Sequence, residues 1–305
     1  MVGRPLYLMI VNPASAGGTT GRRWPRVREV LRHVVQFDEA ISRYPGHAVK
    51  LGREARGARY RYVVCVGGDG TVNEVVNGIF SARESEPVPV LGVLPSGTGS
   101  DFSRTLGVPH HIEAACLRLL AGETTVCDLG VVSYEGEDGT TRRYFVNAAG
   151  VGYDAEVVRR RNGFSRYVRG TVPYVASVVS TFLSYENRAV TVVADGETRT
   201  HRILALVLGI GKYFGGGMRV APEASIDDGL FDLVTIGDVG RLELLWNLPR
   251  VYRGTHLGHP KVSCCKASDV QVEADQPLLI QADGELLGRA PARFRVLPRA
   301  LTVIC

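Results

Sequence analysis

The stretch Gly67-Gly68-Asp69-Gly70-Thr71-Val72-Asn73-Glu74 stands where the pattern of the chain changes from strand to helix. The apolar run Tyr60 to Val66 before it is typical of a buried strand, and the apolar residues after it recur at helical spacing through Phe80. Glycines at such a turn let the backbone approach a ligand, and the exposed N–H groups at a helix start favour a bound phosphate. The stretch therefore predicts a phosphate-binding loop, with a plain glycine turn as the alternative.

Strand-like and helix-like segments alternate on both sides of this loop, from the start of the chain to about Cys127. The strand-like runs are Leu6 to Val11, Phe37 to Ile41, Tyr60 to Val66 and Val88 to Leu94. The helical segments are Arg22 to Val35, His47 to Arg56 and Thr71 to Phe80, with further helices from about Asp101 and Ile112. This alternation predicts an α/β domain with a doubly wound parallel sheet, in which ligands bind at the carboxyl ends of the strands.

The pattern changes after Asp128, where short β-rich segments separated by turns replace the alternation. Such segments predict an antiparallel β-sandwich, with helical insertions at about Asp154 to Tyr185 and Arg241 to Tyr252. We therefore expect two domains, an α/β domain over residues 1–127 and a β-rich domain over residues 128–305. An alternative is that the last residues of the chain belong to the first domain.

Two further glycine-rich loops follow predicted strands in the first domain. Asn12-Pro13-Ala14-Ser15-Ala16-Gly17-Gly18 comes after the first strand, and Pro95-Ser96-Gly97-Thr98-Gly99-Ser100-Asp101-Phe102 comes after the fourth. Because the carboxyl ends of parallel strands share one edge of a sheet, we expect all three loops to open at that edge. None carries the G-K-[S/T] of a P-loop or the G-x-G-x-x-G of a dinucleotide site, which disfavours a dinucleotide oxidoreductase.

The composition is that of a packed globular protein, with 45% hydrophobic and 22% charged residues. The six cysteines form no C-x-x-C pair, which disfavours a zinc site and fits a reducing cytoplasm. No stretch approaches the roughly 20 apolar residues of a membrane helix, and Leu6 to Val11 is too short for a signal peptide. The net charge of +5 is explained by a solvated basic surface or by attraction to an anionic lipid, a nucleotide or a nucleic acid.

The three loops and several later motifs together resemble the catalytic domain of the diacylglycerol kinase family, which includes bacterial lipid kinases and the sphingosine kinases. The matching motifs are N-P-x-S from Asn12, G-G-D-G-T-x-N-E from Gly67, P-x-G-T-x-x-D-F from Pro95, N-A-A-G-V-G from Asn147, D-D-G-L-F-D from Asp227 and D-G-E from Asp283. They run in order over nearly the whole chain. NAD kinases resemble this family at G-G-D-G, and the Pro95 loop and the late D-G-E separate the two. The chain departs from the family pattern at Ser100, usually Asn, and at Ala16, often Gly.

The resemblance implies an NAD kinase-like nucleotide-binding domain over residues 1–127, a lipid-substrate domain over residues 128–305, and ATP in the cleft between them. The positions that match nucleotide-contacting residues of the family are Asn12, Pro13, Ala14, Ser15, Ala16, Ser42, Gly67, Gly68, Asp69, Gly70, Thr71, Gly97, Thr98 and Glu285. Asp228, with the backbone carbonyls near Ser225 and Leu230, matches a structural magnesium site of bacterial members. Asp69 matches an acid linked to the magnesium network, and Asp283 matches the proposed general base.

Asp69 and Asp283 are therefore the expected catalytic residues. A carboxylate inside a phosphate loop repels the phosphates unless a proton or a divalent cation such as Mg²⁺ lies between them, which favours a metal at Asp69. An alcohol holds its proton at neutral pH, so a carboxylate must accept it as the phosphoryl group moves, and we expect Asp283 to do so. The alternative for Asp283-Gly284 is an ordinary hairpin turn, and for Asp227-Asp228-Gly229 a plain turn.

These features predict an ATP- and Mg²⁺-dependent lipid kinase that phosphorylates a hydroxyl of diacylglycerol or a related lipid. We expect it to be cytoplasmic and peripheral at the inner membrane face, with a lipid substrate at an anionic membrane surface and no nucleic-acid partner; a homodimer is left open. The rival functions are an NAD kinase-like phosphotransferase that acts on a soluble substrate and a non-catalytic nucleotide-binding regulator of the same fold.

The segment Asp154 to Arg188 is the expected membrane-docking surface, because it interleaves arginines with aromatic residues. Its basic and aromatic residues are Arg159, Arg160, Arg161, Arg166 and Arg169, with Phe164, Tyr167, Tyr174 and Phe182. The alternative is a helical pair that packs on the sandwich and has a solvated basic edge.

Overall fold

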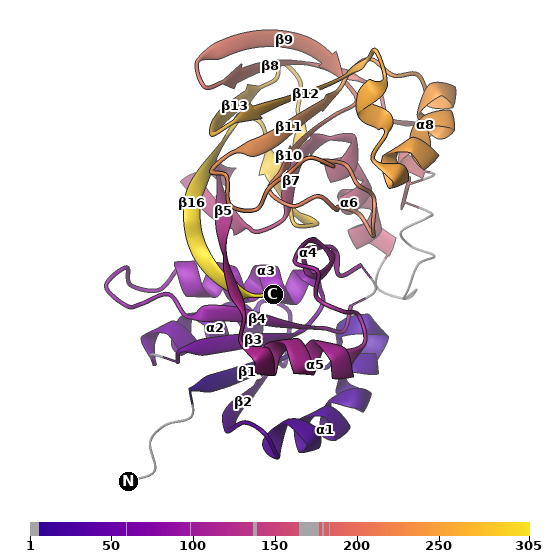
Figure 1. The fold of residues 1–305 in the computed structure, drawn as a ribbon. Helices are drawn as coiled ribbons and strands as arrows, with labels where there is room; N and C mark the ends of the chain where they lie inside the picture. The colour runs from indigo at the N-terminus through magenta and orange to yellow at the C-terminus, as the bar shows by residue number, and fades with distance from the viewer. Residues whose placement is uncertain are drawn as a thin grey trace. The chain divides into compact units, whose positions relative to one another are not determined.

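The computed structural model describes residues 6–58, 60–97, 99–136, 139–164, 177–178, 180–182 and 184–305. The chain divides into two units: unit 1 comprises Met1–Cys127 and Arg299–Cys305, and unit 2 comprises Asp128–Pro298. The course of the chain through both units can be followed in Figure 1. Within the described residues, no helix combines the length and the apolar character of a membrane span.

Unit 1 is built on a parallel sheet. Four strands lie in the order β2-β1-β3-β4, and Val303 near the end of β16 pairs in parallel with Leu91 of β4. The strands are β1 (Tyr7–Val11), β2 (Phe37–Ile41), β3 (Tyr62–Gly67), β4 (Val90–Pro95) and β16 (Ala292–Ile304). The helical elements are η1 (Ser15–Gly18), α1 (Thr19–Arg32), α2 (His47–Gly57), α3 (Asp69–Phe80), α4 (Asp101–Thr105) and α5 (Ile112–Ala121). The predicted doubly wound α/β class is confirmed.

The helices of unit 1 pair with each other beside this sheet, α2 with α3 and α1 with α5 (Figure 1). The first pair depends on two glycines. A Cβ atom at Gly78 would lie 2.0 Å from the carbonyl oxygen of Val49, and one at Gly52 would lie 2.4 Å from that of Val75. Only glycine allows the two backbones to approach this closely, so α2 and α3 hold the strand-to-helix loops at their ends in fixed positions.

Unit 2 contains antiparallel strands. Six of them form a sheet in the order β12-β11-β10-β7-β14-β15, and β16, β13, β8 and β9 follow one another in a second group, where β6 pairs with β5. The strands are β5 (Thr124–Gly136), β6 (Gly139–Phe145), β7 (Ala148–Gly152), β8 (Arg188–Ala194), β9 (Glu197–Ile203), β10 (Ala205–Gly209), β11 (Phe231–Ile236), β12 (Val262–Ala267), β13 (Asp269–Glu273), β14 (Leu279–Ala282) and β15 (Glu285–Arg289). The predicted antiparallel β-sandwich is confirmed.

Two helices of unit 2 lie within the predicted insertions, α6 (Tyr153–Phe164) and α8 (Arg241–Arg253), and a 3-10 turn, η2 (His256–Gly258), follows α8. The rest of the first insertion lies largely outside the described residues, including Arg166, Tyr167, Arg169 and Tyr174. Inside the sandwich the rings of Phe145 and Phe231 stack with centroids 5.7 Å apart. β14 pairs with the central strand β7, which places the turn after β14 beside the start of β7.

Candidate active site

The three glycine-rich loops of unit 1 contact one another beyond the carboxyl ends of β1, β3 and β4. The Asn12 side-chain amide donates to the Thr71 hydroxyl at 3.0 Å, which joins the first loop to the second. The Thr20 hydroxyl donates to Ser96 Oγ at 2.7 Å and also bonds the Ser15 hydroxyl, which joins the first loop to the third. The structure therefore brings together loops that the sequence separates by more than fifty residues.

The glycines of these loops allow close backbone contacts and precede an uncapped helix start. A Cβ atom at Gly97 would lie 2.7 Å from Gly68 Cα, and one at Gly67 would lie 2.5 Å from the Thr71 hydroxyl, so these glycines let the loops touch. α3 begins at Asp69 immediately after Gly68, and no side chain caps it, so Gly70 and Thr71 belong to an uncapped first turn. The N–H groups of such a turn carry partial positive charge, and this helix start can therefore bind a phosphate.

Asn12 organises the opening loop around itself. Its Oδ1 accepts the Ala14 N–H at 3.1 Å, and its backbone carbonyl accepts the Ser15 hydroxyl at 2.9 Å. Ala16 has a φ of 50°, in the left-handed region that favours glycine. An alanine there costs about 1–2 kcal/mol relative to a right-handed conformation, which explains why related loops often have glycine at this position.

Pro13 belongs to this opening loop, and Ser42 lies beside the start of it. A Cβ atom at Gly21 would lie 3.0 Å from the Pro13 ring, so α1 packs closely against the loop. Ser42 is buried, and its N–H donates to the carbonyl oxygen of Val11 at 2.8 Å, which places it next to the loop; its contact with the nucleotide stays a prediction. Thr98 lies outside the described residues.

Asp69 connects the second loop to the third. Its Oδ2 accepts the N–H of Asp101 at 3.1 Å, and its Oδ1 accepts that of Phe102 at 3.2 Å, so the carboxylate caps the start of α4. An ionised carboxylate can accept about four bonds, so these two leave acceptor sites for a cation. Among the described residues no cluster of three or more His, Cys, Asp or Glu could hold a metal, so a cation at Asp69 would need ligands from phosphate and water. Its magnesium role stays a prediction.

Glu74 is a site residue that the sequence analysis quoted in a motif without giving it a role. Its carboxylate accepts the N–H of Gly46 at 3.0 Å and that of Ala48 at 3.1 Å, at the start of α2. It therefore holds the loop that follows Ser42. The presence of Glu74 in the Gly67 motif was the sequence signal for its role. The Thr20–Ser96 contact had no sequence signal, because the fold brings together two residues that are 76 positions apart.

Asp283 lies in the two-residue turn between β14 and β15. Ala282 pairs with Glu285 across this turn, and Asp283 and Gly284 have φ values of 48° and 81°, the consecutive positive φ angles of a type I′ hairpin. Asp283 Oδ1 accepts the N–H of Asn147 at 3.0 Å and that of Ala148 at 3.1 Å.

A third backbone bond completes the anchoring of Asp283, because its Oδ2 accepts the N–H of Val146 at 2.9 Å. Three N–H donors stabilise the charged form of the carboxylate and fix both of its oxygens. The hairpin turn and a rigidly placed carboxylate are therefore the same feature. Its role as a general base, like the nucleotide contact of the half-buried Glu285, stays a prediction.

Side chains from α6 and β14 form a hydrogen-bond network that holds the Asp283-Gly284 turn. Gln281 Nε2 donates to Asp154 at 2.8 Å, and Gln281 Oε1 accepts the Gly284 N–H at 2.9 Å. Arg161 donates to the carbonyl oxygen of Gly284 at 2.9 Å. Complete burial raises the pKa of Asp154 to about 6, and the Gln281 hydrogen bond partly offsets this effect. No sequence pattern links these residues to the turn, since Asp154 and Gln281 are 127 positions apart.

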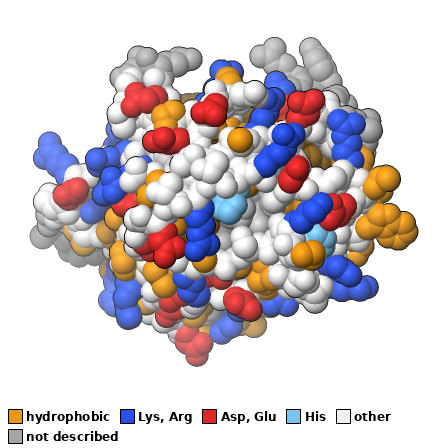
Figure 2. All heavy atoms as spheres, turned by 90° about the horizontal axis from the view of Figure 1, so that it is seen from above, with side chains coloured by type: hydrophobic (Ala, Val, Ile, Leu, Met, Phe, Trp, Pro, Cys, Tyr) orange, Lys and Arg blue, Asp and Glu red, His pale blue; other side chains and the backbone are white. Residues whose placement is uncertain are grey.

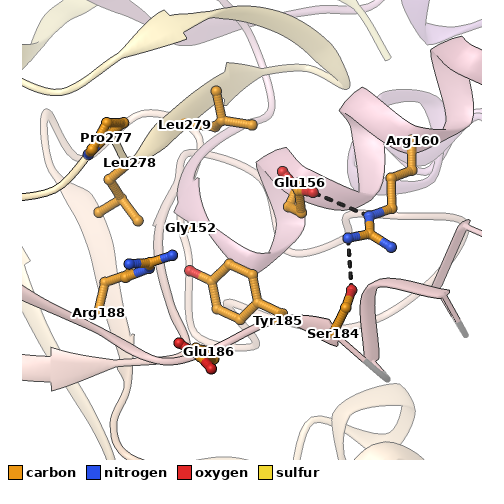
Figure 3. A pocket seen from close by; sticks show the side chains of 10 residues that line it. All are labelled: Gly152, Glu156, Arg160, Ser184, Tyr185, Glu186, Arg188, Pro277, Leu278 and Leu279. Atoms are coloured by element: carbon orange, nitrogen blue, oxygen red, sulfur yellow. Dashed lines mark hydrogen bonds and ion pairs between the residues drawn. The ribbon is translucent and has the colours of Figure 1, made fainter.

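A cavity of about 150 Å³ opens beside α6, and Figure 3 shows the side chains that line it. At its wall the Arg160 guanidinium bonds Glu156 at 3.1 Å and Ser184 at 2.7 Å, while the Tyr185 ring lies close by. The lining residues are Gly152, Glu156, Arg160, Ser184, Tyr185, Glu186, Arg188, Pro277, Leu278 and Leu279. Ligand pockets usually measure about 300–1,000 Å³, so this cavity suits water or a small polar group better than a lipid.

The turn that the resemblance assigns to magnesium already contains a cation. The Lys266 ammonium forms an ion pair with Asp228 Oδ2 and lies 3.5 Å from Oδ2 of the buried Asp232. Asp228 Oδ1 accepts the Leu230 N–H at 3.1 Å, and the Ser225 hydroxyl bonds Asp227 at 2.8 Å. A divalent cation at Asp228 would compete with the Lys266 ammonium for the carboxylate, and the metal role of this turn stays a prediction.

Comparisons with known proteins cover both units. Residues 6–132 match the diacylglycerol kinase catalytic domain, and residues 147–305 match the YegS C-terminal NAD kinase beta sandwich-like domain. The chain is 30% identical over 299 residues to a diacylglycerol kinase from Staphylococcus carnosus, covering 97% of this chain and 93% of that protein. It is 31% identical over 258 residues to a diacylglycerol kinase from Staphylococcus aureus, covering 85% of this chain and 78% of that protein.

Solved structures support the same architecture. A crystal structure of a diacylglycerol kinase from Bacillus anthracis has a TM-score of 0.71 at 21% identity and covers 98% of this chain and 96% of its own. Yeast NADH kinase in complex with NADH has a TM-score of 0.54 at 9% identity and covers 100% of this chain and 84% of its own. At these identities the structures establish the fold alone, while the family follows from the sequence matches. The chain therefore belongs to the diacylglycerol kinase family, a family of lipid kinases.

Proposed function

We propose that this protein transfers the γ-phosphoryl group of ATP to a hydroxyl of diacylglycerol or a related lipid presented at the cytoplasmic membrane surface. The observation that carries the proposal is the contact among three glycine-rich loops beyond one set of parallel strand ends, made by Asn12, Thr71, Thr20 and Ser96. Such loops offer backbone N–H groups and hydroxyls to an anion, and phosphoryl transfer needs mainly positioning and charge compensation.

Unit 1 supplies the residues that would hold the nucleotide. The uncapped first turn of α3, which contains Asp69 and Gly70, suits a phosphate. The Ser15 hydroxyl and the Asn12 amide lie in the neighbouring loop, which the Asn12–Thr71 bond keeps beside α3. A divalent cation bound with the nucleotide would offset the charge of its phosphates, and the acceptor sites left on the Asp69 carboxylate fit such an ion.

Unit 2 supplies the residue that would accept the proton of the lipid hydroxyl. Asp283 is held by three backbone N–H groups, so its carboxylate has one fixed orientation. A fixed carboxylate can take the hydroxyl proton late in the transfer, when the bond between the γ-phosphorus atom and the leaving ADP has weakened. The reaction therefore needs the nucleotide of unit 1 and the lipid hydroxyl beside Asp283 to meet during turnover.

The proposal is tested with purified protein, γ-labelled ATP, Mg²⁺ and a panel of acceptors. Vesicles would contain diacylglycerol, phosphatidylglycerol, a sphingoid base or a polyprenol, and NAD would serve as the soluble acceptor. We expect label in one of the lipids and none in NAD. Label in NAD alone would favour an NAD kinase-like enzyme, and ATP binding without transfer to any acceptor would favour a nucleotide-binding regulator.

A further inference from the structure

α8 exposes an apolar stripe that the described residues of unit 2 leave uncovered. Leu242, Leu245, Trp246 and Pro249 recur at helical spacing on one face, and the first three are 73%, 57% and 82% exposed. No residue of this helix is buried. In Figure 2 hydrophobic side chains project at the right of the view, at the position that α8 occupies in Figure 1. A large exposed tryptophan between two leucines is unfavourable in water and indicates a partner.

The opposite side of the helix is fixed to unit 2, so the exposed stripe is not the result of a loose helix. Val251 packs against a buried cluster that contains Val220 and Val234. Glu243 accepts the Gly240 N–H at 3.1 Å and pairs with Lys261 at 2.7 Å, and the Asn247 amide donates to the Glu243 carbonyl at 2.7 Å. Val251 and the Glu243–Lys261 pair therefore anchor the helix to unit 2 while its apolar stripe faces outward.

The charge on the exposed side of α8 has one sign. Arg241, Arg250 and Arg253 are all exposed, and none of them forms an ion pair with a carboxylate in the part of the chain that the structure describes. The single acidic residue of the helix is Glu243, which Lys261 and His259 contact. Arg250 donates a hydrogen bond to the Asn247 side chain at 3.1 Å, which leaves its charge unneutralised. An apolar stripe flanked by arginines without a carboxylate partner complements a surface that is apolar inside and negatively charged outside.

We propose that α8 is the membrane-docking element of this protein and that its partner is an anionic lipid bilayer. This inference deepens the proposed function, on which it rests, by naming the surface that brings the enzyme to its lipid. Tryptophan and arginine suit the interface between acyl chains and headgroups, where Trp246 would lie among the ester groups and the arginines beside lipid phosphates. A second copy of the chain fits less well, since a two-fold contact through this stripe would bring like-charged arginines together.

The test uses binding of the full chain to vesicles that contain no acceptor lipid, without ATP. The probe is a mixture of phosphatidylcholine and phosphatidylserine, which is anionic but has no free alcohol to phosphorylate, with pure phosphatidylcholine as the neutral comparison. The chain has two tryptophans, and Trp24 is buried, so quenching by lipids brominated near the headgroup reports on Trp246. A W246F variant serves to confirm the origin of the signal. We expect quenching and co-sedimentation with the anionic vesicles, both weakened by salt.

Two sets of variants separate the apolar and the charged contributions. Leu242→Ser, Leu245→Ser and Trp246→Ser together should weaken partitioning by at least about tenfold, because apolar burial drives insertion. Arg241→Gln, Arg250→Gln and Arg253→Gln together should weaken it on anionic vesicles by about tenfold and leave the weak neutral binding unchanged. The matched control is Val34→Ser with Leu117→Ser, two apolar residues of unit 1 that are 58% and 70% exposed. This control should bind like the wild type.

Three results would overturn the inference. They are no quenching of Trp246 by any vesicle, equal binding of the α8 variants and the wild type, and a dimer in solution that the apolar α8 variant abolishes while vesicles have no effect. Since neither ATP nor an acceptor lipid is present, the outcome is independent of catalysis. A chain that docks through α8 but phosphorylates no lipid would count against the proposed function and support the docking surface.

Discussion

α6 and α8 carry three arginines each, yet they use them in opposite ways. In α6, Arg159 and Arg160 both pair with Glu156, and Arg161 donates to the carbonyl oxygen of Gly284 beside the candidate base. In α8 the arginines are exposed and flank an uncovered apolar stripe. Arginines of the same number therefore hold the turn of the candidate base in one helix and face solvent in the other. In the surface expected between Asp154 and Arg188, Arg159, Arg160 and Arg161 form bonds within the chain, and the membrane role of this segment stays a prediction.

The largest effect should come from Asp283, the group that the α6 network supports. Asp283→Asn should lower turnover by about 10²–10⁴-fold, because the amide cannot accept the proton. In the variant an NH₂ group can face the Val146 N–H, which donates to Asp283 Oδ2 in the wild type, and two donors then meet. Thermal unfolding should therefore be measured in addition to turnover in lipid–detergent micelles. Asp275→Asn, an exposed carboxylate in the segment before β14, is the control. Near-normal turnover of the Asp283 variant would remove it from the base role.

α6 differs from α8 also in carrying a buried carboxylate, Asp154, which is expected to titrate. The pKa of Asp154 is raised from 3.8 to about 6 by burial, so the folded state favours the protonated form. The contribution of Asp154 to stability is therefore full below its unfolded pKa near 4 and is lost as pH rises to about 6, by up to about 3 kcal/mol. Asp154→Asn stays neutral at every pH, so relative to wild type it should gain stability between pH 4 and pH 6.

Urea unfolding of both proteins across this pH range measures the difference in unfolding free energy. Asp275→Asn serves again as the exposed control and should show no such trend. A constant difference between Asp154→Asn and the wild type at all pH values would mean that Asp154 does not titrate in this window.

Sequence patterns predicted the architecture because it depends on local signals. The periodicity of Tyr60 to Val66 and the glycines that follow are read within a few residues, and right-handed crossovers then place the loops at one sheet edge. The contacts that define the site are not local. Asp154 meets Gln281 across 127 positions, and Thr20 meets Ser96 across 76, so their pairing depends on the completed fold.

The two helices show a second limit of sequence patterns. The apolar spacing of Leu242, Leu245 and Trp246 is the spacing of a helix face that packs on a core, and periodicity alone does not say whether a core is present. The arginine run of α6 has the composition of a membrane surface, and only the position of Glu156 one turn earlier and of Gly284 in space shows that its charges are used internally.

A smaller effect should separate two neighbouring arginines of α6. Arg161→Met removes the bond to the carbonyl oxygen of Gly284 and should lower turnover roughly tenfold by loosening the turn that carries Asp283. Arg159→Met removes an exposed pair with Glu156 and should change turnover little. Turnover and KM for ATP are measured for both in micelles. Because all the proposed ATP contacts except Glu285 lie in unit 1, KM for ATP should change less than turnover in the Arg161 variant; equal turnover of the two variants would deny Arg161 a positioning role.

The smallest effect concerns Lys266, which also forms ion pairs within unit 2. Replacing it tests whether the Asp228 turn holds an ammonium or a metal. Lys266 is 42% exposed, so solvent screens its pairs, and Lys266→Met should lower the free energy of unfolding by less than about 1 kcal/mol. The change leaves Asp228 and the buried Asp232 without a cation. If the ammonium stands in place of a metal, the variant should gain a Mg²⁺-dependent increase in thermal stability that the wild type lacks. Nucleotide is omitted so that the loops of unit 1 do not contribute, and Lys261→Met, which breaks the surface pair with Glu243, is the matched control. Stabilisation of the wild type by Mg²⁺ to the same extent as the Lys266 variant would instead support a metal site that coexists with the lysine, because a cation that competes with Lys266 for the same carboxylate cannot bind equally well in both proteins.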